Sequence, residues 1–332
     1  MTDPKLTAAT YRYEHTDALF DGSVAVEGFD TTLETAPLVS DIFHGMIAGR
    51  FDVAELGFTY FLRMWDTPES PFMALPIFPN RNFRHSAVFV NSRAGIERPE
   101  DLAGKTIGEF GLYDHDPGVW MKGILSEEYG VTPEQCRWII GGTDHPLPSF
   151  DWVPQPVPPN VEVRHAADGQ TLGAMLETGE IDALISVDVP QAILAGSSKV
   201  RRLFPDYETV ERDYYHRTGI FPLMHVVAIR KDFLADHPAV TRAVYDAFLE
   251  ARNRTAQAYR DQASKQHMRV MTPWFSELFA ENRRLLSEDW WPYGVDKNRK
   301  TVDTFLRYHH EQGLSRRLLS SDDIFVPDLL SS

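Results

Sequence analysis

Apolar and polar positions along the chain follow two periods in turn, which predict strands and helices. The segments 5–11, 51–56 and 105–110 have the short apolar runs of strands. Residues 37–49 instead place apolar side chains at helical spacing and end at a glycine; they are Val39, Ile42, Phe43, Met46 and Ile47, with Gly49 at the end. This alternation predicts an α/β protein in which helices flank the sheets.

The same periods continue through the rest of the chain. Strands are predicted at 85–91, 180–186 and 225–232, and a helix at 171–179 precedes the second of these strands. A long helical region opens near the end of the last strand, and the pattern stays helical from there apart from a Trp- and Tyr-rich break at 289–294. The C-terminal part is therefore expected to be mainly helical.

A capped helix is predicted at 116–130. Asp116 suits the N-cap position and Gly130 the C-terminal stop. The free N–H groups at a helix N-terminus bind anions, so Tyr113, His115 and Asp116 become candidates for substrate contact. The alternative is that Asp116 does no more than cap the helix.

Two stretches, 48–57 and 178–187, share one layout. Each runs from the end of a helix through a glycine, a charged residue, an apolar residue and an aspartate into a buried strand. The match fits two lobes built on the same βαβ plan, although so short a match can also be coincidence. Ligands of open α/β sheets bind beyond the carboxyl ends of the strands. Thr59, Tyr60 and Asp188, which follow these strands, are therefore substrate-binding candidates.

Length and charge narrow the class of protein. The chain has 332 residues, more than one small core accommodates, so two lobes are expected. Its formal net charge is -15, which argues against nucleic acid and against anionic membranes as partners. A small anionic ligand remains compatible with this charge, but it requires a local basic pocket.

Cysteine usage and the apolar runs add two further expectations. Cys136 is the only cysteine, so an intrachain disulfide is excluded. The N-terminal segment shows no basic stretch followed by an apolar one, and no run approaches the length of a membrane span. We therefore expect a cytoplasmic protein without a membrane partner.

The segment 78–91, "FPNRNFRHSAVFVN", is the candidate for the basic pocket. Arg81 and Arg84 stand just ahead of an apolar strand, and the planar guanidinium group matches the geometry of a carboxylate. His85 follows them and can exchange a proton near neutral pH. In the alternative reading, both arginines lie on the surface and His85 is a hydrogen-bonded strand residue.

Two predicted strands each open with a histidine, His85 and His225. In a two-lobed protein such strands can be the two crossovers between the lobes, which would bring both histidines near one ligand. Thr218 belongs to the cluster ahead of the second strand and is a further substrate-binding candidate. The alternative is two unrelated histidines at strand ends.

Glu55 lies within an apolar strand and completes the set of catalytic candidates. Burial would raise the pKa of its carboxyl group and make it a proton carrier, whereas strand alternation can also point it outward. The histidines and carboxylates named so far are suitable metal ligands, but none shows dedicated ligand spacing, and no metal is predicted.

Two other segments leave alternatives open. The loop 144–160 contains six prolines and is expected to be stiff and extended, either as a lid or binding arm or as a surface decoration. Trp274, Trp290 and Trp291 in the helical tail are either a homo-oligomer interface or part of the core.

Several stretches together resemble the 4,5-dihydroxyphthalate decarboxylases, a family with the type II periplasmic-binding-protein fold. They span most of residues 18–232, and the likeness continues in "HPAVTRAVYDAFLEA". The matching stretches are "LFDGSVAVEGFD", "FDVAELGFTYFL", "SPFMALPIFPNRNFRHSAVFVN", "RPEDLAGKTIGEFG", "GVWMKGILSEEYGV", "WIIGG", "GEIDALIS" and "RRLFPDYETVERDYYHRTGIFPLMHVVAIRKD".

The resemblance implies a two-lobed fold with the ligand cleft between the lobes. We expect one discontinuous lobe from 1–88 and 226–332, which includes the C-terminal helices, and a second lobe from 89–225. The implied activity is a cofactor-free loss of carbon dioxide from a hydroxylated aromatic acid, which for 4,5-dihydroxyphthalate yields protocatechuate.

On chemical grounds we assign expected roles within this reaction. Arg81 and Arg84 would hold the second carboxylate, helped by amides at the start of the helix at 116–130. His85 would give a proton to the ring carbon, and His225 or Glu55 would interact with the phenolic oxygens. Two alternatives stay open: a non-catalytic small-carboxylate binding protein, or an enzyme of another reaction on this fold.

Overall fold

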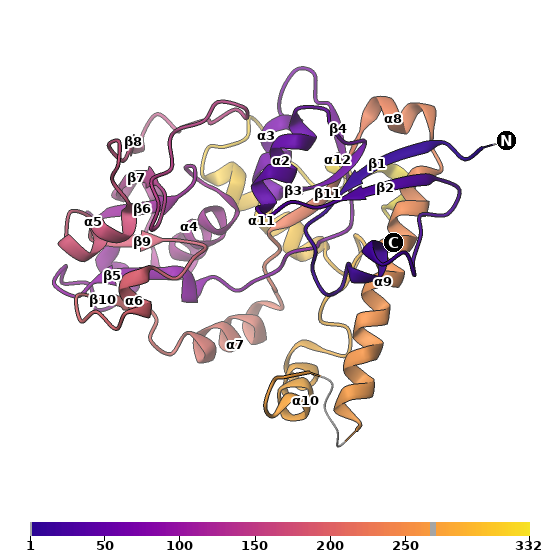
Figure 1. Cartoon of the computed structure of the whole chain (residues 1–332). Helices are drawn as coiled ribbons and strands as arrows, with labels where there is room; N and C mark the ends of the chain where they lie inside the picture. Colours follow the sequence, from indigo (N-terminus) through magenta and orange to yellow (C-terminus); the bar gives the residue numbers. More distant parts are fainter. Residues whose placement is uncertain (1, 266–269) are drawn as a thin grey trace.

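The computed structural model describes residues 2–265 and 270–332 and contains two mixed sheets flanked by helices (Figure 1). The first sheet has the strand order β2-β1-β3-β11-β4. Its strands are β1 (Lys5–Ala9), β2 (Asp30–Glu34), β3 (Val53–Gly57), β4 (Phe72–Leu75) and β11 (His225–Arg230). β1 pairs in parallel with β2 and β3, and β11 pairs antiparallel with β3 and β4. We call the part built on this sheet lobe 1.

The second sheet has the order β10-β5-β9-β6-β7-β8, and the part built on it is lobe 2. Its strands are β5 (Val88–Asn91), β6 (Thr106–Phe110), β7 (Arg137–Gly141), β8 (Glu162–His165), β9 (Ala183–Ile185) and β10 (Val200–Arg202). The neighbouring strands β9, β6, β7 and β8 are parallel to one another, whereas β5 runs antiparallel to β9 and β10. The lobe boundaries expected at 88/89 and 225/226 stay a prediction.

Helices cover both sheets and form the tail of the chain. They are α1 (Asp17–Phe20), α2 (Val39–Ile47), α3 (Phe58–Trp65), α4 (Asp116–Tyr129), α5 (Leu172–Thr178), α6 (Gln191–Leu194), α7 (Tyr207–Thr218), α8 (Lys231–Asp236), α9 (Val240–Ala263), α10 (Phe275–Leu286), α11 (Arg299–Glu311) and α12 (Ser321–Ile324). Within the described residues, no helix combines the length and apolar character needed to cross a bilayer.

Two local expectations differ from the structure. The strand predicted at 85–91 begins only at Val88, because His85–Ala87 form a short 3-10 turn. Asp116 is the first residue inside α4 and not its N-cap, a position that His115 occupies. The reason is that the Asp116 carboxylate accepts a hydrogen bond from the backbone of lobe 1, so it is not free to cap its own helix.

The two connections between the lobes run side by side in opposite directions. Met224 N donates to Asn80 O at 2.8 Å, and Asn82 N donates to Pro222 O at 3.0 Å. An isolated antiparallel bridge joins Arg81 to Leu223 within the same pair of segments. The crossovers therefore form a hydrogen-bonded ribbon that leads directly into β11. This ribbon fixes the position of His225, the first residue of that strand.

The C-terminal segment contacts both lobes. Gln312, just after α11, donates to the carbonyl of Val119 on α4 at 2.9 Å. Further along, Val326 N donates to Ala74 O at the edge strand of the first sheet at 3.0 Å. The end of the chain thus joins lobe 2 to lobe 1 along one side of the molecule, where α11 lies between the lobes in Figure 1.

Candidate active site

Glu55 and His225 face each other on neighbouring central strands, β3 and β11. Glu55 is fully buried and its Oε1 lies 2.6 Å from His225 Nδ1. The same oxygen accepts a hydrogen bond from the Tyr13 hydroxyl at 2.7 Å, and Oε2 accepts from Thr10 Oγ1 and Tyr11 N, both at 2.8 Å. Of the two orientations considered for Glu55, the structure has the inward one.

The electrostatics of Glu55 differ from the expectation. Burial raises its pKa, but the hydrogen bond and charge of His225, with the donors at Tyr11 and Tyr13, outweigh this effect and the net pKa is lowered. The expectation that burial makes Glu55 a proton carrier is therefore wrong. The lowered pKa favours the carboxylate form of Glu55, and its hydrogen bond fixes the orientation of the His225 ring through Nδ1.

The other ring nitrogen of His225, Nε2, makes no hydrogen bond to any described residue. The ring stands edge-on to Phe43 at 5.1 Å between centroids, and the residue is 8% exposed. In the sheet, the Cα of His225 pairs with that of Gly57, the last residue of β3. A histidine fixed through one nitrogen and free at the other can exchange a proton with a ligand at that edge.

Asp116 reaches this edge from lobe 2. Its Oδ1 accepts a hydrogen bond from Thr59 N at the start of α3 at 2.6 Å. Its Oδ2 lies so close to Gly57 that a Cβ on that glycine would be 2.7 Å away. Burial raises the pKa of Asp116, and the nearby His225 and the Thr59 amide oppose the rise only in part. Burial thereby favours the protonated form of this carboxyl group more than in an exposed aspartate.

Aromatic side chains form a wall beside these groups. The ring of Tyr60 is tilted against Phe43 at 5.3 Å and stacks on Trp152 at 5.3 Å with 17° between planes. Trp152 belongs to the loop 144–160 of lobe 2, so this loop crosses to lobe 1 and is more than a surface decoration. Burial raises the pKa of Tyr60, with Asp116 adding to the rise.

Arg84 is a buried cation whose charge interacts with Asp116. It is 7% exposed, its Nε contacts Met224 Sδ at 3.3 Å, and its terminal nitrogens make no hydrogen bond within the described part of the chain. Burial lowers the pKa of its guanidinium group to about 10, while Asp116 and Glu211 act in the opposite direction. A buried guanidinium with unused donors is suited to bind a carboxylate.

Arg81, the second expected carboxylate ligand, is used differently. Its guanidinium group donates to Phe221 O at 3.1 Å and to Pro292 O at 2.9 Å, and it also bonds the side chain of Asn298. These contacts join the crossover segment to the C-terminal tail. Both terminal nitrogens are engaged, which leaves Arg81 without a free donor pair for a ligand carboxylate.

His85 contacts other residues than His225 does. It is fully buried, its ring contacts those of Phe204 at 5.2 Å and Tyr214 at 5.4 Å, and neither ring nitrogen has a hydrogen-bond partner among the described residues. Burial, with a contribution from Arg217, lowers its pKa to about 4. His85 is neutral at physiological pH and packs within lobe 2.

Tyr113 and His115 belong to a buried ionic cluster beneath the start of α4. Lys122 forms ion pairs with Glu109 and Asp114, and its ammonium lies 4.1 Å from the ring centre of Tyr113. His115 Nδ1 lies 3.2 Å from Glu109 Oε1. This cluster supports the turn before Asp116 and does not reach His225 directly.

The two remaining candidates lie outside this group. Asp188 is exposed beyond β9, with its amide bonded to Ser186 Oγ at 3.1 Å. Thr218 ends α7 and donates to Tyr214 O at 2.7 Å. No group of three or more His, Cys, Asp and Glu side chains within residues 2–265 and 270–332 is arranged to hold a metal ion.

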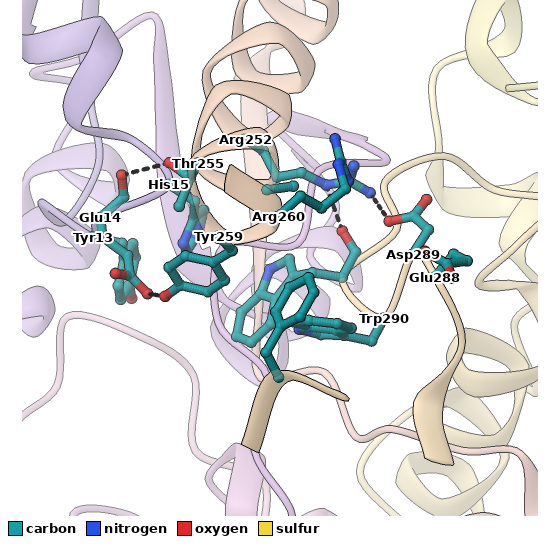
Figure 2. A pocket seen from close by; sticks show the side chains of 13 residues that line it. Tyr13, Glu14, His15, Arg252, Thr255, Tyr259, Arg260, Glu288, Asp289 and Trp290 are labelled. Atoms are coloured by element: carbon teal, nitrogen blue, oxygen red, sulfur yellow. Dashed lines mark hydrogen bonds and ion pairs between the residues drawn. The ribbon is translucent and has the colours of Figure 1, made fainter. Parts of the chain in front are cut away.

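Sequence reasoning missed Tyr13, which bonds Glu55 and lies 3.4 Å from His225 Nδ1. It follows β1 at the same edge of the sheet, so the rule that points to residues after parallel strands applies to it. Its ring stacks on His15 at 5.1 Å, and the two residues line a cavity of about 310 Å³ with Arg252, Tyr259, Trp290 and Trp291. Figure 2 shows this cavity between the residues after β1, helix α9 and the tail.

Comparison with known proteins identifies the family. No family model matches the chain. A 4,5-dihydroxyphthalate decarboxylase of Comamonas testosteroni is 32% identical over 332 residues, which cover 100% of this chain and 99% of that protein. A protein of the same name from Pseudomonas putida is 29% identical over 215 residues, which are 65% of this chain and 83% of that protein.

Solved structures show the same architecture. The sulfonate-binding protein SsuA of Methylobacillus flagellatus has a TM-score of 0.57 at 16% identity. The match covers 99% of this chain and 93% of the SsuA chain. The aliphatic sulphonate-binding protein SsuA of Escherichia coli has a TM-score of 0.54 at 11% identity, with 100% of both chains covered. At these identities the likeness concerns the fold alone, and it confirms the expected periplasmic-binding-protein-like architecture.

The full-length relative decides the family. Identity above 30% that extends over this entire chain and nearly all of the Comamonas protein is more than a shared fold. The chain belongs to the 4,5-dihydroxyphthalate decarboxylase family.

Proposed function

We propose that this chain removes one carboxylate of 4,5-dihydroxyphthalate as carbon dioxide and leaves protocatechuate, without a cofactor. The observation that carries the proposal is the hydrogen-bonded pair of Glu55 and His225, whose charge acts on the pKa of the buried carboxyl group of Asp116. Two relatives of that name, at 32% and 29% identity, support this choice of substrate.

The chemistry defines what such a site must contain. The electron pair left by a departing aryl carboxylate lies in the ring plane, where the ring does not stabilise it. Protonating the carboxyl-bearing carbon first removes this difficulty. A hydroxyl group para to that carbon assists when a base takes its proton. The site therefore needs a base, an acid and a cation for the second carboxylate.

The three needs are met by three described residues. His225 Nε2 is the base for the para hydroxyl, because Glu55 holds its Nδ1. Asp116 is the acid, since burial raises its pKa. Arg84 binds the second carboxylate through its unused terminal nitrogens. The donor role expected for His85 is not part of this proposal, because its lowered pKa keeps the ring neutral.

The proposed steps balance in protons and electrons. His225 takes the hydroxyl proton, the ring gains electron density, and the carbon that bears the carboxylate takes the proton of Asp116. The bond between the ring and the carboxylate then breaks, its electron pair restores the aromatic ring, and carbon dioxide leaves. His225 returns its proton to the phenolic oxygen, and Asp116 is reprotonated from water, so each turnover consumes one proton.

The test is incubation of the pure protein with 4,5-dihydroxyphthalate while carbon dioxide and protocatechuate are quantified. We expect stoichiometric formation of both. Tight binding of the diacid without consumption would instead favour a non-catalytic small-carboxylate binding protein.

We further propose that the enzyme acts in the breakdown of phthalates and that it does so in the cytoplasm. A homo-oligomer would use the tail near Trp274, which is 80% exposed. Trp290 and Trp291, by contrast, line the cavity beside Tyr13 and are less suited to a subunit interface.

A further inference from the structure

One buried arginine of lobe 1 binds two separate segments of lobe 2. Arg63, on α3, is 3% exposed. Its Nη1 donates to Pro154 O at 2.8 Å, and its Nη2 donates to Tyr113 O at 2.6 Å. Both acceptors are neutral backbone carbonyls. The charge is balanced at longer range by Asp114 and Glu109, which oppose the lowering of the Arg63 pKa by burial.

The first of these segments is the proline-rich loop 144–160. Next to Pro154, Val153 is buried, and Trp152 stacks on Tyr60 of lobe 1. Trp152 also lies 5.2 Å from the His44 ring, and Phe150 stacks on it at 4.9 Å. The loop thus covers Tyr60, and the bond from Arg63 lies two residues beyond the ring that does so.

The second segment leads directly into α4. Tyr113, whose carbonyl Arg63 binds, lies three positions before Asp116. The amide of Thr59 bonds Asp116 itself. Thr59 and Arg63 are four positions apart on α3, so they lie on one face of the helix. This face therefore holds lobe 2 at two points, one at the proposed acid and one just before it.

We infer that Arg63 is a positioning residue for the reaction, because one guanidinium group holds both the loop that covers Tyr60 and the turn that presents Asp116 to His225. The inference rests on the proposed function for its catalytic part only. The attachment of loop 144–160 to α3 is a property of the protein without substrate.

The attachment is tested without substrate by limited chymotrypsin digestion. Phe150 and Trp152 are cleavage residues within the loop. Arg63→Met removes both hydrogen bonds, which should raise the rate of cleavage in 144–160 on the order of 10- to 100-fold. The matched control is Arg242→Met on α9, which breaks an exposed pair with Asp246 and a cation–π contact with Tyr245 and should leave the rate unchanged. Equal cleavage rates in wild type and Arg63→Met would overturn the inference.

The catalytic part is tested by steady-state kinetics. Arg63→Met and Trp152→Ala should each raise KM for 4,5-dihydroxyphthalate by about tenfold or more, and the double variant should be no worse than the worse single variant. Arg63→Lys, which keeps the charge and one donor direction, should recover part of the loss and decides the case if Arg63→Met does not fold. Wild-type kcat and KM in a folded Arg63→Met variant, or in Arg63→Lys if Arg63→Met does not fold, would contradict a positioning role, as would full additivity with Trp152→Ala. Absence of turnover in the wild type would contradict the proposed function and leave the digestion result standing.

Discussion

Tyr13 and His225 share one oxygen of Glu55: the phenol donates to Oε1 at 2.7 Å, and the imidazole Nδ1 lies 2.6 Å from the same atom. Two groups 212 positions apart in the sequence thereby fix a single carboxylate at the edge of the first sheet. The charge of that carboxylate is fully buried, so its hydrogen bonds decide which tautomer the histidine adopts.

Loss of this carboxylate should affect catalysis more than loss of the phenol. Glu55→Gln removes the charge that orients His225 and is expected to lower kcat about 10²–10⁴-fold, the range for a positioned acid or base. Tyr13→Phe removes the hydrogen bond to Glu55 and the longer contacts with Asn80 and His225, and should lower kcat about tenfold. Both are measured as carbon dioxide release at saturating substrate. A Tyr13→Phe variant as impaired as Glu55→Gln would mean that the phenol itself takes part in proton transfer.

Replacement of His225 and replacement of His85 should have different effects on turnover. His225→Gln removes the proposed base and should abolish most turnover with little change in Tm. His85→Gln should keep kcat within a few-fold of wild type, because the lowered pKa of His85 leaves it neutral and its ring contacts only lobe 2. Each variant is compared with wild type in kcat and Tm. Full inactivity of a folded His85→Gln protein would restore the role first expected for it.

The arginines form a second matched pair. Arg84→Lys loses the planar pair of donors and should raise KM for the diacid by about 10-fold or more, with Tm nearly unchanged. Arg81→Lys breaks the contacts with the crossover and the tail, so it should lower Tm and leave KM unchanged. The reverse result, a KM effect at Arg81 alone, would move the carboxylate site to the other side of the crossover ribbon.

The raised pKa of Asp116 predicts a pH dependence with a defined sign. An acid must be protonated to act, so kcat should fall as pH rises through the pKa of this group. The ionised form is penalised by burial, so the folding free energy of the wild type should weaken over the same rise in pH, above the ordinary value of 3.8. Asp116→Asn should remove both dependences. Its Tm advantage over wild type should be larger at pH 8 than at pH 4, and a constant difference would count against the shift.

Gly57 tests the crowding where the lobes meet. A methyl group there would lie 2.7 Å from Asp116 Oδ2 and 2.8 Å from Tyr60 Cδ2. Gly57→Ala should therefore displace the proposed acid, lower kcat and cost about 1–3 kcal/mol of unfolding free energy. Gly141→Ala at the end of β7 is the control, because its nearest neighbour would be a side-chain carbon at 3.2 Å. Chemical denaturation and carbon dioxide release measure the two effects.

Much of the fold follows from local patterns in the sequence. Apolar periodicity places β3 and β11 close to where they lie, the rule for residues beyond strand ends leads to Tyr60, and the crossover argument leads to His225. The same reasoning does not tell which of Arg81 and Arg84 is free to bind a ligand. The acceptors that engage Arg81 lie 140 to 217 positions away, so only the tertiary fold decides which guanidinium group stays free.

The start of α4 shows the same limit. Local preference assigns Asp116 to its own helix as a cap, yet the amide that it binds belongs to Thr59 in the other lobe. The inward orientation of Glu55 is decided likewise by its long-range partners, Tyr13 and His225, and not by alternation along β3.

The C-terminal segment that bonds both Val119 and Ala74 has a consequence for how a ligand enters. Arg81 of the crossover ribbon bonds Pro292 O and the side chain of Asn298, so the ribbon and the tail lie beside each other. A tail bonded to both lobes restrains their separation as rigid halves. We therefore expect ligand entry to depend on the loop around Trp152, which is attached to lobe 1 through the side chains of Tyr60 and Arg63.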